Sequence, residues 1–511
     1  MYETNQLPFP FWGAETTRKM GRDPLAVQNS SVVIYDNMVK GITNMTVRVR
    51  YNGFFCWLLT FIAERLQATN PSKIDNPKEQ IKYIRRGELL LAYLMQFNYP
   101  LVNGVSGSIF AQRNIYSTVL NIADGADIEN KPNVYWQMRL GVFGQYFLGV
   151  LTQLKLVFLP DANHQTYRVT PEGYKLCQIF RQSLTEDKEI LFWEAISTGV
   201  ILQERLSEFK CLALHIIDNN EELSEYEMLF SKPERQDFTG QDISHRFLTI
   251  KLLLKYIQGD GASIERRKFV LAFLKANFLN ALEANMDVTE EQLSWFLYEL
   301  NELSHAAYEA HHFALLYSTT EEPQPLDEVL DKLEGEYIEY SNSTIDDYGI
   351  YELYDELQSC YKEKNYGGLI FVASRLLVAL YKAISKHISK LLEYSKDEYD
   401  VSHPGFAPSM LIRLVVDENR SCDWRFAEDC IYFAINDHLR SSYSKSSIGQ
   451  GIVHNYMVDD GLIWQLRRPD PVRTSPRLSN VLQYIEDLKW IKRAGDCYSL
   501  TERGIQILMQ Q

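Results

Sequence analysis

The chain has 511 residues, of which 46% are hydrophobic and 23% are charged, a composition typical of a water-soluble folded protein. Its length allows about three domains, each with its own core. The net charge of −15 argues against a protein that binds nucleic acid over its whole surface.

The cysteines and the apolar runs indicate the compartment. Seven cysteines are scattered along the chain without a Cys-x-x-Cys pair, which favours a reducing environment. The first residues lack the basic and apolar regions of a signal peptide. The longest apolar runs, such as residues 54–63, are too short to span a bilayer. We therefore expect a cytoplasmic protein without a membrane segment.

The N-terminal region begins with an irregular arm, residues 1–29, that carries the basic cluster Arg18, Lys19 and Arg22. A short helix or strand is expected at residues 31–40. Residues 41–66 then predict a helix that Thr43, Asn44 or Thr46 could cap.

Four arginines of this region are candidate anion-binding residues. Arg48 and Arg50 would lie in the first turn of the predicted helix, where the helix dipole disfavours cations. They therefore need a partner, either an internal carboxylate, which we favour, or a phosphate. Arg85 and Arg86 precede the next predicted helix. Residues 104–108 could form a nest of backbone amides for an anion, although a tight turn between helices is the simpler interpretation.

Four motifs carry a family resemblance. They are G-x-T-x-x-T-x-R-x-R-Y at residues 41–51, R-R-G-E at 85–88, G-V-x-G at 104–107 and the pair Tyr135-Trp136. In this order, over residues 35–150, they resemble an uncharacterised family of prokaryotic phage-defence-island proteins that combines such a region with winged-helix-like segments. The resemblance implies a setting in bacterial antiviral defence and brings no catalytic residue with it.

A helix, a β-hairpin and a second helix are predicted at the end of the N-terminal region. The first helix is residues 144–154, the strands are 156–158 and 167–169, and the turn is 160–165. Thr170 is a helix cap, with Pro171 at the first helical position and Glu172 close to the positive end of the helix.

The middle of the chain is helical by its apolar period from residue 184 to about 287 and again from 289 to 317. Residues 286–359 contain 19 Asp and Glu against one Lys. This acidic belt has three interpretations: a solvated helical face, a docking surface for a basic partner, or a shield over basic parts of the same chain. The belt accounts for more than the whole negative charge, so the acidity is regional.

The same helix–hairpin–helix pattern returns after a Pro- and Gly-containing boundary at residues 397–408. Residues 476–490 predict a helix with one apolar face, residues 490–492 and 498–500 predict the hairpin strands, and Thr501 caps a last helix, 502–509. Helix, hairpin wing and helix is the order of a winged helix. We therefore expect two winged-helix modules, which bind either DNA or protein.

Residues 464–493 carry a net charge of +4, so the second module is the basic one. We expect its predicted helix to lie in or near a DNA groove, with phosphate contacts from the wing. The candidate DNA-binding residues are Arg467, Arg468, Arg473, Arg477, Lys489, Lys492 and Arg493.

Two clusters could hold a metal. His305, Glu309 and His312 share one helical face, but no further ligand is spaced to complete a zinc site, and a packed cluster is the more common arrangement. The second cluster lacks the order of histidines and aspartates that a metal phosphohydrolase needs; it contains Asn436, Asp437, His438, His454, Asp459 and Asp460. We expect no catalytic residue, no metal and no cofactor.

The sequence predicts a mainly α, multidomain protein with domains at residues 1–183, 184–396 and 397–511. The predicted function is that of a non-catalytic DNA-binding or DNA-sensing subunit, which binds double-stranded DNA through phosphates and works with a separate effector protein. Two alternatives stay open. One is a scaffold whose modules and acidic belt bind partner proteins, and the other is a nuclease or metal-dependent phosphohydrolase.

Overall fold

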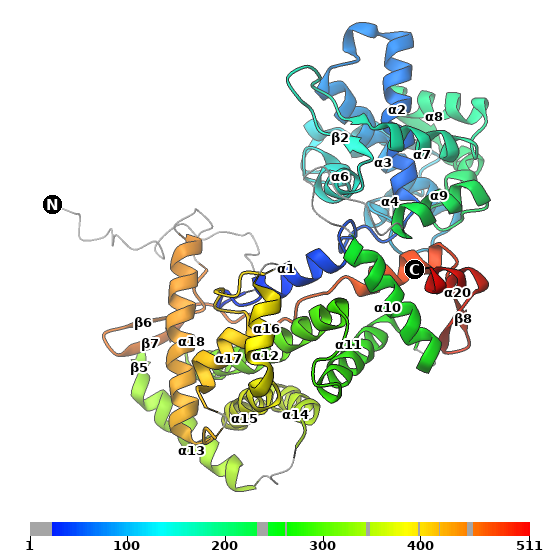
Figure 1. The fold of residues 1–511 in the computed structure, drawn as a ribbon. Coiled ribbons are helices and arrows are strands. Elements are labelled where there is room, and N and C mark those ends of the chain that lie inside the picture. Colours follow the sequence, from blue (N-terminus) through cyan, green and yellow to red (C-terminus); the bar gives the residue numbers. More distant parts are fainter. Residues whose placement is uncertain are drawn as a thin grey trace, which may run out of the picture. The chain divides into compact units, whose positions relative to one another are not determined.

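The computed structural model describes residues 23–231, 244–260, 263–343, 348–396, 399–417, 419–446 and 453–510. The predicted basic cluster of the N-terminal arm lies outside these ranges. Helices make up 66% of the structure and the sheets are few and small, which confirms a mainly helical protein (Figure 1). The chain divides into two compact units: unit 1 is residues 1–35 and 274–474, and unit 2 is residues 36–273 and 475–511.

Both units are built from discontinuous segments, whereas the sequence predicted three consecutive domains. The chain passes from one unit to the other after residues 35, 273 and 474. Two helices contain such a boundary, α1 (Asn29–Met38) and α11 (Arg266–Glu283). One consequence for function is that both helix–hairpin–helix segments belong to unit 2.

Unit 1 is organised around two helices that are buried on most of their faces, α12 (Glu290–Ser318) and α15 (Tyr366–Ile384). They pack against each other, and α15 also packs against α13 and α14. The other helices of the unit are α13 (Leu326–Ser343), α14 (Ile350–Glu363), α16 (Ile388–Ser395), α17 (Ala407–Val415) and α18 (Trp424–Lys445). The helix α12 begins with a capping box, which Thr289 and Gln292 form.

Unit 1 also contains a small antiparallel sheet with the strand order β5-β7-β6. Its strands are β5 (Gln324–Pro325), β6 (Tyr456–Asp459) and β7 (Leu462–Gln465). The β6–β7 register pairs Tyr456 with Gln465. The stretch Tyr366–Ser395 is long and apolar enough to cross a membrane, but 72% of its most apolar window is buried inside the protein, as in a core helix.

Unit 2 has its core between α2 (Tyr51–Thr69), α3 (Pro77–Asn98) and α7 (Pro171–Arg181). Aromatic rings fill this core, where Trp57 stacks on Phe61 and meets Phe192 edge to face. The remaining helices of its first part are α4 (Ser108–Asn114), α5 (Ile122–Ala126), α6 (Leu148–Gln153), α8 (Glu186–Thr198), α9 (Asn220–Ser231) and α10 (Ser244–Asp260).

Three two-stranded sheets complete unit 2. The pair β1 (Val119–Asn121) and β4 (Val200–Leu202) is antiparallel, as are the hairpin β2 (Val157–Phe158) and β3 (Arg168–Val169) and the hairpin β8 (Ile491–Ala494) and β9 (Cys497–Leu500). Two further helices come from the C-terminal segment, α19 (Leu478–Asp487) and α20 (Glu502–Met509). In Figure 1 this red segment lies beside the green helix α10, with which α20 and β9 are in contact.

Candidate functional site

Both predicted helix–hairpin–helix segments are present, and their main chains make the same hydrogen bonds. In the first segment Leu156 N donates to Leu151 O at 2.8 Å, and in the second Trp490 N donates to Ile485 O at 2.9 Å. The residue before each donor, Lys155 or Lys489, has a positive φ of 56° or 59°. Each helix therefore ends in the same left-handed turn and delivers the chain into a hairpin.

The caps that follow the hairpins are also equivalent. Thr170 N donates to Leu156 O, and Thr501 N donates to Trp490 O, both at 3.0 Å. The threonine hydroxyls accept from Gly173 N and Gly504 N at 3.0 and 3.1 Å, which satisfies an amide at the start of α7 or α20. The predicted threonine caps are confirmed. The two segments are structural repeats that differ in the length of the hairpin turn.

The second repeat is enlarged by two helices that lie more than 200 residues earlier in the chain. Ser263 forms an isolated antiparallel bridge with Cys497, and Ile264 N donates to Asp496 O at 3.1 Å, so residues 263–264 pair with the hairpin at one point. This bridge lies between α10 and α11. No sequence pattern indicates this partner, because a single bridge has no periodicity.

Aromatic rings join these helices to the hairpin. Phe269 on α11 meets Tyr498 on β9 with ring centroids 6.1 Å apart, and Tyr256 on α10 meets Phe269 at 5.5 Å. Phe269 and Tyr498 are almost completely buried. The element order of this part of unit 2 is therefore helix, bridged segment, helix, insertion of residues 274–474, helix, hairpin and helix.

The helix predicted to enter a DNA groove is covered. None of the residues of α19 is exposed, and most of its side chains are buried. Asp487 accepts from Arg48 Nη1 at 2.7 Å, and Asn480 Nδ2 donates to Thr43 O at 2.6 Å. The helix also begins two residues later than predicted, because Arg477 has a φ of 59°. Groove insertion by α19 is therefore incompatible with this structure.

The candidate DNA-binding residues are divided between the units. Arg467, Arg468 and Arg473 belong to unit 1, and the other four belong to unit 2. Arg473 is ion-paired with the buried carboxylates of Glu299 and Glu302. This pairing neutralises its charge within unit 1, so Arg473 is not available for the predicted phosphate contact. Arg468 stacks over Tyr317 at 4.8 Å and donates to the Tyr366 hydroxyl at 3.3 Å.

Three of the four candidates in unit 2 also have internal partners. Arg477 pairs with Asp36 at 2.5 Å, and Lys489 Nζ donates to Ile217 O at 2.9 Å. Arg493 pairs with Glu486 at 2.7 Å, but its side chain stays 54% exposed. Lys492 is exposed and makes no ion pair or side-chain hydrogen bond to a residue that the structure describes.

Two exposed cations escaped the sequence analysis. Arg267 and Lys268 lie in the first turn of α11, shortly after Ser263, whose bridge joins this segment to the hairpin. Lys268 pairs with the exposed Glu265 at 2.6 Å. The sequence Arg266-Arg267-Lys268 was a visible signal, but nothing in it indicated that it lies beside β9. Arg267, Lys268, Lys492 and Arg493 are named the wing cations below.

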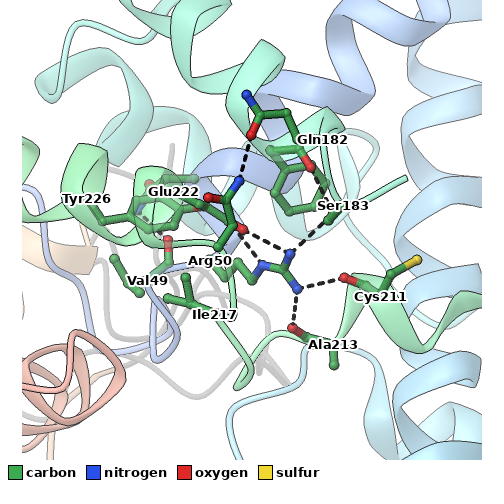
Figure 2. A network of polar contacts seen from close by, with 12 residues as sticks. Val49, Arg50, Gln182, Ser183, Cys211, Ala213, Ile217, Glu222 and Tyr226 are labelled. Atoms are coloured by element: carbon green, nitrogen blue, oxygen red, sulfur yellow. Dashed lines mark hydrogen bonds and ion pairs between the residues drawn. The ribbon is translucent and has the colours of Figure 1, made fainter. Parts of the chain in front are cut away.

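The four candidate anion-binding arginines are structural. Figure 2 shows Arg50, whose guanidinium pairs with Glu222 at 2.8 Å and donates to the carbonyl oxygens of Cys211 and Ala213. Burial lowers the pKa of Arg50, but Glu222 raises it more, so the net shift is upward. A cavity of about 350 Å³ adjoins this pair. All donors of Arg50 are occupied, including one that faces Ser183, so none is left for an anion.

Arg48, Arg85 and Arg86 have internal partners as well. Arg48 pairs with Asp487, whose pKa burial raises to about 6 in spite of the arginine. Arg85 donates to the carbonyl oxygens of three residues, and Arg86 pairs with Asp127 at 2.6 Å. The internal carboxylate favoured in the sequence analysis is thus present for Arg48 and Arg50. The predicted cap is wrong, because α2 begins at Tyr51 without a side-chain cap.

The remaining candidates are the two predicted metal clusters and the turn at residues 104–108. Among the residues that the structure describes, no three His, Cys, Asp or Glu side chains are grouped so that they could hold a metal ion. His305 contacts Gly405 O at 2.6 Å, and His312 contacts the Tyr456 hydroxyl and Asn455. His438, from the second predicted cluster, stacks on His312 with centroids 4.7 Å apart. These histidines form a packed cluster, as the simpler interpretation expected.

The turn at residues 104–108 has left-handed glycines at 104 and 107, and one of its amides, Ser106 N, donates to the Tyr51 hydroxyl at 2.9 Å. This geometry is that of a tight turn before the seven-residue helix α4.

The chain matches no protein-family model, and no curated protein and no solved structure is significantly similar to it.

Proposed function

We propose that the second repeat, together with α10 and α11, is a winged-helix module that binds double-stranded DNA without sequence specificity. The observation that carries the proposal is the bridge between Ser263 and Cys497. It lies where a winged helix has a short strand between its first and second helices. The element order then agrees with a winged helix whose second and third helices are separated by an insertion.

The proposed mode of binding uses the wing. Because α19 is covered, contacts to base edges from this helix are not part of the proposal. The wing cations lie on the hairpin and on the adjoining start of α11, and all four are exposed. Exposed cations contact phosphates and carry no sequence information. Four such contacts correspond to a slope of about −3 to −4 when the logarithm of the binding constant is plotted against that of the salt concentration.

A salt titration with labelled duplex DNA tests this proposal. We expect the full chain to bind at low salt and the wing variant to lose affinity and about three units of slope. The wing variant combines Arg267→Ala, Lys268→Ala, Lys492→Ala and Arg493→Ala. The control variant removes four exposed cations from other loops and helices of unit 2, with the same change in net charge. Its substitutions are Lys78→Ala, Lys131→Ala, Arg139→Ala and Lys175→Ala.

Equal losses in the two variants would mean that charge alone, and not the wing, determines binding. If the full chain does not bind duplex DNA at low salt, DNA binding is excluded for the isolated chain. The alternative is then the scaffold. One observation favours it for the first repeat, where Phe158, Leu159 and Tyr174 are 39%, 51% and 49% exposed around the hairpin and α7. An apolar surface of this kind fits a protein partner better than DNA.

The setting remains part of the proposal. The protein acts in the cytoplasm of a bacterial cell as a non-catalytic subunit of an antiviral defence complex, and a separate effector protein supplies the chemistry. The resemblance of residues 35–150 to phage-defence proteins supports this setting. Purification of the chain from a phage-infected host, with crosslinking, tests for the effector.

A further inference from the structure

A second cavity of unit 2 has no part in the proposed DNA contact. Its volume is about 870 Å³, and it lies between α3, α4, β1 and the loop at residues 130–134. Small-molecule sites in proteins are mostly of 300–1,000 Å³. Its walls carry two aromatic residues and several amide side chains, together with one arginine and one aspartate. The cavity is therefore large enough for a small organic ligand and close to neutral.

Tyr93 is one of the two aromatic residues that line this cavity. The residue is on α3 and only 2% exposed, yet it lines the cavity. Its hydroxyl makes no hydrogen bond to any residue that the structure describes. Burial raises the pKa of Tyr93 to about 12, so the hydroxyl keeps its proton at neutral pH. Because the hydroxyl has no partner in the described part of the chain, it is available to a ligand as a hydrogen-bond donor.

Amide groups extend this hydrogen-bonding surface. Asn114 Nδ2 donates to Phe110 O at 2.8 Å, which leaves its side-chain oxygen available as an acceptor. Asn133 lines the same cavity, and its side chain makes no hydrogen bond within the described part of the chain. Amides of this kind present a donor and an acceptor side by side, which matches the edge of a nucleobase.

Phe110 supplies an apolar face. Its ring lies against Gly125, where a Cβ would come within 2.7 Å of Cε1. The backbone at Gly125 therefore holds the ring in place, and the residue is only half-buried. Every nucleobase can stack on such a ring, with a gain of about 1–3 kcal/mol per base.

Arg113 supplies the charge. It is exposed, lines the cavity and has no ion-pair partner among the described residues. The acid of the cavity, Asp124, is already engaged, since it accepts from Asn121 Nδ2 at 2.5 Å and its own main-chain amide donates to the side chain of Asn121. A free guanidinium at the edge of a cavity is a good partner for a phosphate, which it can bind through two parallel hydrogen bonds.

We infer that this cavity binds a nucleotide. The base stacks on Phe110, its edge bonds to the Tyr93 hydroxyl and the amides of Asn114 and Asn133, and its phosphate meets Arg113. The ligand could be a free nucleoside monophosphate or one unit of a single strand, since both present a base beside a phosphate. The inference is independent of the wing, because none of the wing cations lines this cavity.

Calorimetric titration of the full chain with AMP, GMP, CMP and UMP, and with the four nucleosides, tests the inference. We expect at least one monophosphate to bind with a Kd below about 1 mM. Tyr93→Phe keeps the ring and removes only the hydroxyl, and we expect it to weaken binding of nucleotide and nucleoside alike by about three- to tenfold. Arg113→Gln should weaken the nucleotide by about tenfold or more and leave the nucleoside unchanged.

Matched controls use the same substitutions at exposed positions outside the cavity. They are Tyr174→Phe and Arg139→Gln, and neither should change the Kd. If none of the four monophosphates binds at millimolar concentration, the inference is wrong. It is also wrong if a monophosphate binds to Tyr93→Phe and to Arg113→Gln with the same Kd as to the unaltered chain. The ligand then lies outside this cavity.

A short single-stranded oligonucleotide distinguishes the two sources of the ligand. A pentamer that binds more tightly than the monophosphate, and competes with it, identifies a strand as the ligand. Equal or weaker binding identifies the free nucleotide. The wing variant should bind the monophosphate as the unaltered chain does, so failure of nucleotide binding and failure of duplex binding are observed separately.

Discussion

Gly504 lies directly against the main-chain carbonyl oxygen of Trp490, so closely that a Cβ at this position would overlap that atom. Gly173 has the same relationship with the carbonyl oxygen of Leu156. In both repeats the helix after the hairpin can approach the hairpin only because this position lacks a side chain. Each of these glycines is therefore a packing requirement of its repeat.

Replacement of Gly504 by alanine should lower the free energy of unfolding of unit 2 by about 1–3 kcal/mol, since the neighbour is backbone and cannot rotate away. Gly173→Ala should act in the same way. Hydrogen exchange of the hairpin peptides at increasing urea concentrations measures the loss of unfolding free energy in each variant. Gly149→Ala is the control: Gly149 lies in α6 with open space around it, so alanine should raise stability by about 0.5–1 kcal/mol. A neutral Gly504→Ala would contradict the observed packing.

The buried pair of Arg50 and Glu222 predicts strong coupling. Their side chains are 3% and 0% exposed, so loss of one partner leaves an unpaired charge in the core. We expect Arg50→Met to cost about 3–5 kcal/mol of unfolding free energy. Arg50→Lys should recover little of it, because three donors on a flexible stem cannot replace the planar guanidinium.

The double variant Arg50→Met, Glu222→Met removes both charges and should be more stable than Arg50→Met alone. A double-mutant cycle from denaturant unfolding gives the coupling energy. Additive effects of the two substitutions would show that the pair is not coupled.

The histidines of unit 1 predict a loss of stability in acid. Burial lowers the pKa of His311 to about 4 and that of His438 to about 3, whereas an unfolded histidine has a pKa near 6.5. The unfolded chain therefore takes up protons first, and unit 1 should lose stability as the pH falls below about 6.5. Each such histidine contributes up to about 1.4 kcal/mol per pH unit.

Hydrogen exchange of α12 and α18 between pH 7.5 and 5 measures this loss. His438→Gln should reduce the slope of unfolding free energy against pH by the contribution of about one proton. His164→Gln, in the exposed loop between β2 and β3, is the control and should leave it unchanged. An unchanged slope for His438→Gln would mean that His438 is not neutral in the folded protein.

Glu88 predicts the opposite pH dependence for unit 2. Burial raises its pKa to about 7, although the Tyr135 hydroxyl and the amides of Phe143 and Val142 donate to it. The folded state keeps the proton to higher pH than the unfolded chain does. The free energy of unfolding should therefore fall as the pH rises from about 4.5 to about 7. Above pH 7 this contribution should no longer change. The total fall is at most about 3 kcal/mol.

Glu88→Gln removes this titration, and its amide oxygen can still accept from Phe143. Exchange of the α3 peptides at pH 5 and pH 8 should then differ less than in the unaltered chain. A fall that persists in Glu88→Gln would assign it to another group.

Local signals predicted the repeats well. Each threonine cap and its glycine lie three residues apart, so the pattern needs no knowledge of the rest of the fold. Contacts between distant residues could not be predicted in this way. Arg473 lies 174 residues from Glu299, and Ser263 is far from Cys497 in the sequence, so neither pairing leaves a periodic pattern. The start of α2 was misplaced for a related reason: Thr43 and Thr46 bond to each other in a turn, instead of capping the helix.

The candidate site shows the same limit. Charge along the sequence indicated a basic C-terminal module, and two of its seven cations, Lys492 and Arg493, are exposed on the wing. Arg267 and Lys268 come from a segment for which the apolar period predicted a helix and nothing more. The charge of Arg48 is neutralised by Asp487, which is 439 residues away in the sequence. Net charge can thus be read from a sequence, but its neutralisation by internal partners cannot.

The discontinuous build of unit 2 sets an order of events during synthesis. Arg48, α10 and residues 263–264 leave the ribosome long before α19 and the hairpin that complete their packing. At about 5–20 residues per second, the roughly 200 intervening residues take about 10–40 s to translate. During that interval the surfaces that will receive residues 475–510 stay open to solvent. The nascent chain is therefore a natural substrate for chaperones that hold exposed apolar segments.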